Sequence, residues 1–130
     1  MIGLDTSAII DLFKGESKAQ AFFEKNKELY VTTIISYLEL FFGIDPENKK
    51  HSIEAEYYRN FFEDNQIIGL SEDSCEEASK ILWRLKKEGN SIEDFDCVIA
   101  GILIANGINK IVTKNKKHFD RIKELKVISY

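Results

Sequence analysis

The chain has 130 residues, of which 44% are hydrophobic and 31% are charged, a balance typical of one folded domain and not of a disordered or fibrous protein. Its longest apolar run, residues 97–105, is far shorter than the roughly 20 residues of a membrane-spanning helix, and Asp5 and Asp11 interrupt any secretory signal pattern. Cys75 and Cys97 lack the CxxC spacing of structural zinc sites. We therefore expect a single cytoplasmic domain over residues 1–130.

The charge is unevenly distributed along the chain. The net charge of −4 argues against a protein that coats nucleic acid in general. Residues 110–130, however, contain seven basic and only two acidic residues, so the net charge is +5 in this segment and −9 in the rest of the chain. Such a segment can bring a phosphate backbone to an acidic site. The alternative is an ordinary solvated polar surface.

The first half of the chain alternates between strand-like and amphipathic helical segments. In chain order the pattern predicts a strand over residues 2–4, a helix ending at Gly15, a helix over residues 18–25, a strand over residues 29–31, and a helix from the capping residue Thr33 to Gly43.

The second half continues the alternation. It predicts a charged helical stretch over residues 47–65, a strand over 67–70, a helix from the cap Ser71 to Gly89, an almost wholly apolar and therefore buried helix ending at Ala105, a strand over 110–113, a short basic helix, and a strand over 126–129. Connections of this length between strands imply a parallel sheet covered by helices on both faces, that is, an α/β fold.

Polar residues follow two of the predicted strands. Asp5 comes directly after the first strand, and the segment from Thr113 to Asn115 follows the strand at residue 110. Ligands of such sheets bind outside the carboxyl ends of the strands, so both segments point to one edge. Asp5 also has a structural alternative, because aspartate before a helix is a preferred cap.

Glu39 lies within the apolar segment Ile34–Phe42. Burying an unpaired carboxylate is strongly unfavourable, so this position indicates a functional acid. The alternative is that Glu39 and Ser36 form a polar, exposed stripe on the helix.

Asp94 and Asp96 precede the buried helix. One of them is needed as the helix cap, where the helix dipole favours an ionised carboxylate, and the other is then available for function. We assign function to Asp96, which is nearer the apolar helix.

Carboxylates that converge repel one another unless a cation joins them. Oxygen ligands without paired cysteine or histidine suit Mg²⁺, or Mn²⁺, and exclude a typical zinc site. The acids therefore predict a divalent cation, which can activate water against a phosphate ester.

Four segments together match a family pattern in order and spacing over nearly the whole chain. They are Ile2 to Ser7, the helix from Thr33 to Gly43 with Glu39-Leu40, the stretch from Ser91 to Ala100, and Val112 to Asn115 with Phe119 beyond it. With these segments the chain resembles the PIN-domain family, in particular the VapC-type toxins of prokaryotic toxin–antitoxin pairs. The resemblance implies a three-layer α/β/α sandwich with a central parallel sheet of about five strands, and a metal-dependent endoribonuclease.

The resemblance also implies roles for individual residues. Asp5 and Asp96 resemble the principal metal ligands, and Glu39 the third acid. Asp94 would be an accessory residue, either a cap or an outer partner. Thr6 and Thr113 would support the carboxylates through hydroxyl hydrogen bonds.

The chain departs from the family pattern at Asn115, where many members carry another acid. An amide oxygen can bind a metal but adds no negative charge, which leaves open one metal position or two. Asp120 is an alternative source of this negative charge, but its place beyond Phe119 favours a surface role. RNA would approach over Lys114, Lys116 and Lys117 through sequence-independent phosphate contacts.

The aromatic group Tyr57, Tyr58, Phe61 and Phe62, with Phe41 and Phe42, exceeds the needs of one exposed helix face. We expect most of it to be core and the remainder to serve a homodimer or a small antitoxin protein, as the family resemblance implies.

Other functions remain open on the sequence alone. They are a receiver-like phosphate-accepting signalling domain, a catalytically inactive RNA-binding PIN domain, a housekeeping RNA-processing enzyme and a 5′-flap DNA nuclease. Glu39 argues against the receiver, and the compact length of the chain against the flap nuclease.

Overall fold

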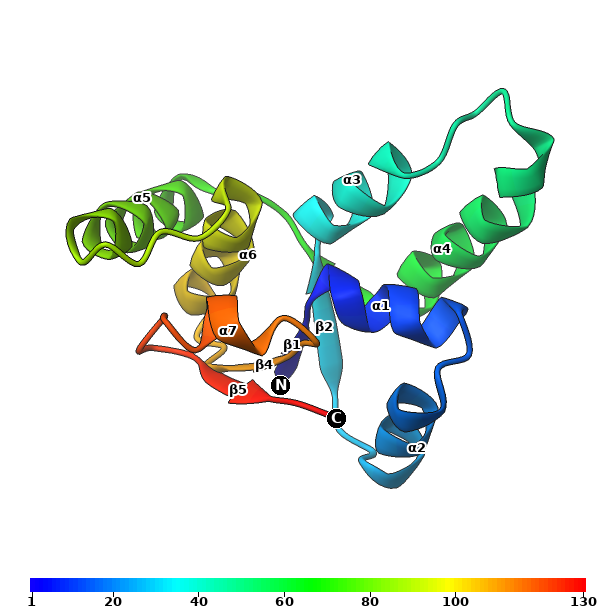
Figure 1. Cartoon of the computed structure of the whole chain (residues 1–130), viewed down its shortest axis with the longest axis horizontal. Coiled ribbons are helices and arrows are strands. Elements are labelled where there is room, and N and C mark those ends of the chain that lie inside the picture. Colours follow the sequence, from blue (N-terminus) through cyan, green and yellow to red (C-terminus); the bar gives the residue numbers. More distant parts are fainter.

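The computed structural model describes residues 1–130 and contains five strands, seven α-helices and one 3₁₀ helix (Figure 1). In chain order the elements are β1 (Ile2–Leu4), α1 (Thr6–Phe13), α2 (Ser17–Lys25), β2 (Tyr30–Thr33), α3 (Ile34–Phe42), η1 (Lys49–His51), α4 (Ser52–Asp64), β3 (Gln66–Ile68), α5 (Glu72–Lys87), α6 (Asp94–Ala105), β4 (Lys110–Val112), α7 (Lys116–Phe119) and β5 (Lys126–Ile128).

The strands form one sheet in the order β3-β2-β1-β4-β5, and every neighbouring pair is parallel. The predicted α/β fold with about five parallel strands is therefore confirmed. The first strand lies in the middle, with β2 on one side and β4 on the other. The chain therefore adds β2 and β3 on one side of β1 first, and later adds β4 and β5 on the other side.

Local sequence explains where several helices begin and end. The hydroxyl of Thr33 caps α3 by accepting from the amide of Ser36, and Ser71 and Ser74 form a reciprocal capping box at α5. Past the end of α5, Gly89 has φ +71°, a left-handed conformation that glycine adopts without strain. The predicted caps at Thr33 and Ser71 are confirmed.

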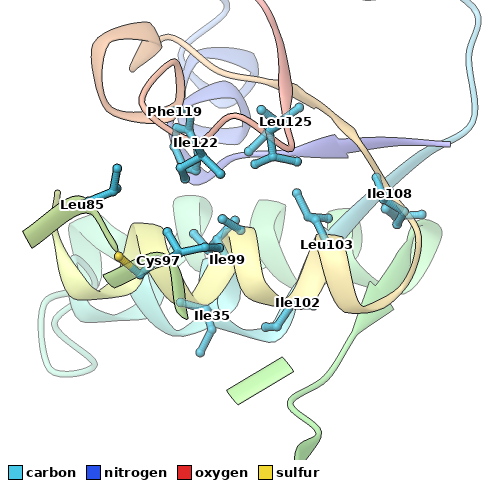
Figure 2. Close-up of a cluster of buried hydrophobic side chains, with 14 residues drawn as sticks. Ile35, Leu85, Cys97, Ile99, Ile102, Leu103, Ile108, Phe119, Ile122 and Leu125 are labelled. Atoms are coloured by element: carbon cyan, nitrogen blue, oxygen red, sulfur yellow. The ribbon is translucent and has the colours of Figure 1, made fainter. Parts of the chain in front are cut away.

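Two hydrophobic clusters lie on opposite faces of the sheet. The larger joins α5, α6 and the segment around α7 to Val31 of β2 and Ile111 of β4. Figure 2 shows Ile99 and Leu103 of α6 pointing toward Phe119, Ile122 and Leu125. Helix α6 is therefore the centre of this layer, as its apolar sequence predicted.

The smaller cluster joins α1, α3 and α4 to β1 and β4. Tyr58 and Phe62 are buried in it, whereas Tyr57 and Phe61 pack at its margin. The prediction that most of the aromatic group is core is confirmed for Tyr58 and Phe62, whereas Phe41, Tyr57 and Phe61 are only partly buried against the core. Phe42 differs from the rest, because it is 71% exposed.

Helix α3 contributes to both clusters. Ile35 belongs to the larger one and Leu40 to the smaller one. The outer face of the same helix carries Ile34, Leu38 and Phe42, spaced four residues apart and all exposed. The helix is thus anchored in both layers and presents an apolar stripe outward.

The hairpin of α5 and α6 depends on a close helix approach. A Cβ atom added to Gly101 would lie 2.6 Å from the carbonyl oxygen of Ser74 and 2.7 Å from the amide nitrogen of Ala78. Only glycine fits at this crossing. None of the helices combines the length and the apolar character needed to cross a membrane.

Candidate active site

The candidate site lies at the carboxyl ends of the three central strands, β2, β1 and β4. Asp5 follows β1, and its amide donates to the carbonyl of Val112 at the end of β4. Because β1 pairs with strands on both sides, Asp5 stands where the strand order reverses, which is the usual ligand position in such sheets. Helices α1 and α3 begin side by side at this edge (Figure 1).

Asp5 is held by hydroxyl groups and does not serve as a helix cap. It is 4% exposed and occupies the position before α1, but its side chain makes no capping hydrogen bond. Instead its Oδ2 accepts from Ser7 Oγ at 2.9 Å and from Thr113 Oγ1 at 2.8 Å. The alternative that Asp5 is a structural cap is therefore wrong.

Glu39 is directed toward α1. Thr6 Oγ1 donates to Glu39 Oε1 at 2.7 Å, and the same hydroxyl lies 3.0 Å from Oγ of the buried Ser36. The polar stripe formed by Ser36 and Glu39 thus exists, but it faces Thr6 and the site, so the exposed-stripe alternative is wrong.

The environment of Glu39 opposes its charge. Burial raises the pKa of the Glu39 carboxyl, the hydrogen bond from Thr6 opposes this rise, and the negative charges of Asp5, Asp96 and Glu93 raise the pKa further. The ionised acids at this edge therefore repel one another, which favours a cation among them.

Asp96 lies in the first turn of α6 and is 7% exposed. Its Oδ2 is 2.8 Å from Nδ1 of His118, a residue of α7. Burial raises the pKa of Asp96, the contact with His118 opposes the rise, and the charge of Asp5 adds to it. Asp5 and Asp96 therefore influence each other across the edge of the sheet.

The structure separates Asp94 from the other acids. Glu93 occupies the position before α6, no side chain caps that helix, and the expected capping role of Asp94 or Asp96 is wrong. Asp94 is exposed and lines a small cavity with Leu82 and Lys86 of α5. Residues two positions apart in a helix point to nearly opposite sides, which explains why Asp94 and Asp96 do not share a face.

Sequence reasoning missed three residues at this site: Ser7, Glu93 and His118. Glu93 precedes Asp96 by three residues, a spacing that places both on one side of a helix and could have revealed it. Ser7 follows Asp5 by two residues. His118 has no local signal, because its partner Asp96 is 22 residues away.

Asn115 is connected to Asp96 through His118. Its amide nitrogen Nδ2 lies 2.8 Å from Nδ1 of His118, and its backbone amide donates to Thr113 Oγ1 at 2.8 Å. Nδ1 of a histidine carries either a hydrogen or a lone pair, so it serves Asp96 or Asn115 at any one time. Asn115 thus belongs to the hydrogen-bond network around the acids.

The acids offer carboxylate oxygens to a cation. Oδ2 of Asp5, Oδ2 of Asp96 and Oε1 of Glu39 are engaged by the chain, and the second oxygen of each has no hydrogen bond. The only buried side-chain polar atom without a partner is Thr32 Oγ1, so these second oxygens reach solvent. No three His, Cys, Asp or Glu side chains form a ready-made metal cage.

The basic segment borders the same edge. Lys114, Lys116 and Lys117 are exposed, and the amide of Lys114 donates to Ser7 Oγ at 3.0 Å. Asp120, which ends α7, is exposed and makes no ion pair. Three lysines are thus available to an anionic ligand beside the acids.

Comparison with known proteins gives consistent matches. The family model described as PIN domain matches residues 2–125. The chain is 35% identical over 121 residues to "Ribonuclease VapC1" of Methanocaldococcus jannaschii, an alignment that covers 93% of this chain and 80% of that protein.

Solved structures of similar chains agree with the fold. A chain of VapBC-1 from nontypeable Haemophilus influenzae is 29% identical, with a TM-score of 0.78 and coverage of 99% of this chain and 98% of that one. A chain of VapBC2 from Rickettsia felis, bound to a DNA fragment from the promoter, is 24% identical with a TM-score of 0.83, covering 100% and 99%.

Proposed function

The chain belongs to the PIN-domain family, and on this premise we propose that it is a VapC-type endoribonuclease, the toxin of a toxin–antitoxin pair. The observation that carries the proposal is the convergence of Asp5, Glu39 and Asp96 from three separate chain segments at the point where the strand order reverses. The identity of 35% to a ribonuclease over most of the chain supports the same activity.

The proposed cofactor is Mg²⁺, with Mn²⁺ as a substitute. The donor set is made of carboxylate oxygens, one of which remains free on each of the three acids. Mg²⁺ is commonly held by one or two carboxylates and keeps several waters, so these residues fit it by chemistry. When bound, the cation supplies activation of water and neutralisation of charge at the scissile phosphate.

Each residue of the site has a proposed task. Asp5 and Asp96 hold the cation, and Glu39, whose raised pKa reflects its burial and its acidic neighbours, is the third acid that takes a proton from the attacking water. Thr113 and Thr6 keep Asp5 and Glu39 in place through their hydroxyl groups.

The basic segment is the proposed path of the RNA. The exposed ammonium groups of Lys114, Lys116 and Lys117 suit contacts with phosphates, which position a nucleic acid without reading its sequence. Replacing all three by alanine should weaken RNA binding and reduce its salt dependence.

An antitoxin is the proposed protein partner. The related structures include a toxin–antitoxin complex from Klebsiella pneumoniae and VapBC-1 of H. influenzae. The exposed stripe of Ile34, Leu38 and Phe42 is a surface for this protein or for a second copy of the chain. Phe42→Ser should disrupt one of these assemblies while leaving the fold intact, as measured by light scattering with and without the antitoxin.

The decisive experiment compares cleavage of RNA by the wild type, Asp96→Asn and Asp94→Asn, with Mg²⁺ and with chelator. We expect Asp96→Asn to lose more than about 100-fold in rate, since even the outer partners of a metal ligand contribute about 10–100-fold. Asp94→Asn is the matched control, because the same charge is removed from the opposite side of the same helix turn, and it should cleave like the wild type.

Three results would contradict the proposal. Equal loss in the two variants would reject the assignment of Asp96, and cleavage that resists chelator would reject the metal. A wild type that binds RNA without cutting it would instead identify a catalytically inactive PIN domain, which the amide at Asn115 makes a specific alternative.

A further inference from the structure

One buried acid takes no part in the proposed catalytic site. Asp11, which lies in α1, is 5% exposed, and its Oδ2 accepts from the hydroxyl of Tyr130 at 2.6 Å. Its other oxygen, Oδ1, lies 3.6 Å from the ammonium group of Lys114. A buried carboxylate is strongly unfavourable without such partners, so the contacts of Asp11 are built into the fold.

Lys114 has two contacts with the segment that follows β1, one at Ser7 beside the active site and one at Asp11 in α1. Its backbone amide donates to Ser7 Oγ, and Ser7 in turn donates to Oδ2 of Asp5. Its side chain runs to Asp11, whereas Lys116 and Lys117 make no ion pair. Lys114 is therefore the one lysine of the three whose ammonium group lies within ion-pair distance of an acid.

The geometry leaves the ammonium group of Lys114 able to bind a further anion. The separation of 3.6 Å from Asp11 exceeds the roughly 2.7–2.9 Å of a charge-assisted hydrogen bond. The side chain of Lys114 is 65% exposed. Its three N–H donors thus remain available, while the negative charge of Asp11 restrains the side chain.

We propose that Asp11, fixed by Tyr130, is a positioning residue for Lys114, and that the restrained ammonium group binds a phosphate of the RNA beside the cleavage site. This inference rests on the proposed ribonuclease function. A lysine that is already ordered loses less conformational freedom when it binds a phosphate. Burial and the hydrogen bond to Asp11 raise the pKa of Tyr130, so its hydroxyl remains a donor at neutral pH.

The test is a double-mutant cycle on RNA binding. The anisotropy of a fluorescein-labelled single-stranded RNA of mixed sequence is measured in chelator for the wild type, Asp11→Asn, Lys114→Ala and the double variant. We expect Asp11→Asn to weaken binding about threefold, although removing a negative charge near RNA would by itself strengthen it. Lys114→Ala should lower the salt slope by about 0.7, and Asp11→Asn should then weaken binding no further.

Two matched variants separate positioning from a structural role. Lys116→Ala removes an equal charge from a lysine without an ion pair, so its effect should add to that of Asp11→Asn. Tyr130→Phe removes only the hydroxyl and keeps the ring against Phe22 and Phe23. It should weaken binding only when Lys114 is present, and it provides the same comparison if Asp11→Asn fails to fold.

The outcomes are distinguishable. The positioning role is overturned if Asp11→Asn binds RNA as well as or better than the wild type. It is also overturned if Asp11→Asn weakens RNA binding by the same factor in the wild type and in Lys114→Ala. In both cases the ribonuclease function stands. If the wild type neither binds nor cuts RNA, the proposed function itself fails, and the inference fails with it.

Discussion

Replacing Thr113 by valine removes one hydroxyl group and leaves the shape of the side chain almost unchanged. Thr113 is fully buried, and its Oγ1 donates to Asp5 Oδ2 while accepting from the backbone amide of Asn115. The chain contains a matched control in Thr32, which is equally buried but whose Oγ1 has no hydrogen-bond partner. The same substitution at the two positions should therefore change the free energy of unfolding in opposite directions.

The magnitudes follow from the hydrogen bonds. A hydrogen bond to a charged group contributes about 1.5–3 kcal/mol of net stability, so Thr113→Val should lower the free energy of unfolding by about 2 kcal/mol. At Thr32 the hydroxyl is desolvated without compensation, and valine removes that penalty. Thr32→Val should raise the free energy of unfolding by roughly 1 kcal/mol.

The assay has two parts. Urea unfolding followed by circular dichroism in chelator gives the free energy of each variant, and cleavage of RNA with Mg²⁺ gives kcat/KM. Thr113→Val should also lose about 10–100-fold in kcat/KM, because the hydroxyl orients a metal ligand, whereas Thr32→Val should cleave like the wild type.

Equal changes in stability at the two positions would refute this reasoning. So would a Thr113→Val protein of full stability and full activity, because the contact with Asp5 would then contribute nothing.

Three further predictions concern the close helix crossing and the acids. Gly101→Ala should destabilise the protein by about 1–3 kcal/mol by forcing α5 and α6 apart, whereas Gly69→Ala, with no atom within 4 Å of the new Cβ, should be nearly neutral in the same urea titration. Because the folded protein raises the pKa of Glu39 above its ordinary value of 4.5, stability in chelator should fall as pH rises from 4.5 through the raised pKa. Glu39→Gln should reduce this loss of stability with pH and raise the melting temperature at neutral pH. If the variant's stability depends on pH as the wild type's does, the raised pKa of Glu39 is contradicted. Glu93→Gln removes a charge that acts on Glu39 and Asp96, so it should weaken Mn²⁺ binding several-fold by calorimetry, and undiminished affinity would exclude Glu93 from the site.

The sequence predicts the order of elements well because their signals are local. Thr33 and Ser71 are residue types that cap helices, and the apolar run after Asp96 requires burial on every side. The ends of strands are harder to predict where pairing with a neighbouring strand decides them. The strand β2 extends to Thr33 because that residue pairs with Ile68 of β3, a contact that no local pattern contains.

The candidate site likewise contains residues that local sequence predicts and residues that depend on long-range packing. Asp5, Glu39 and Asp96 stand out because each is an acid in an apolar setting, and the structure brings all three to one edge. The capping role expected for Asp94 or Asp96 failed because the first residue of α6 could not be fixed from sequence, and a shift of one residue turns a helix by about 100°. His118 depends on how α7 packs against α6, which only the assembled sheet determines.

The central pairing of β1 with β4 has a consequence for synthesis of the protein in the cell. Asp5 leaves the ribosome before its hydroxyl partner Thr113, which lies 108 residues later in the chain. At about 5–20 residues per second, this interval takes roughly 5–20 seconds. Throughout that time the nascent chain lacks the strand that completes its active-site edge. The hydrogen bond that holds Asp5 in the candidate site therefore forms only after the 108 residues that separate it from Thr113 have been translated.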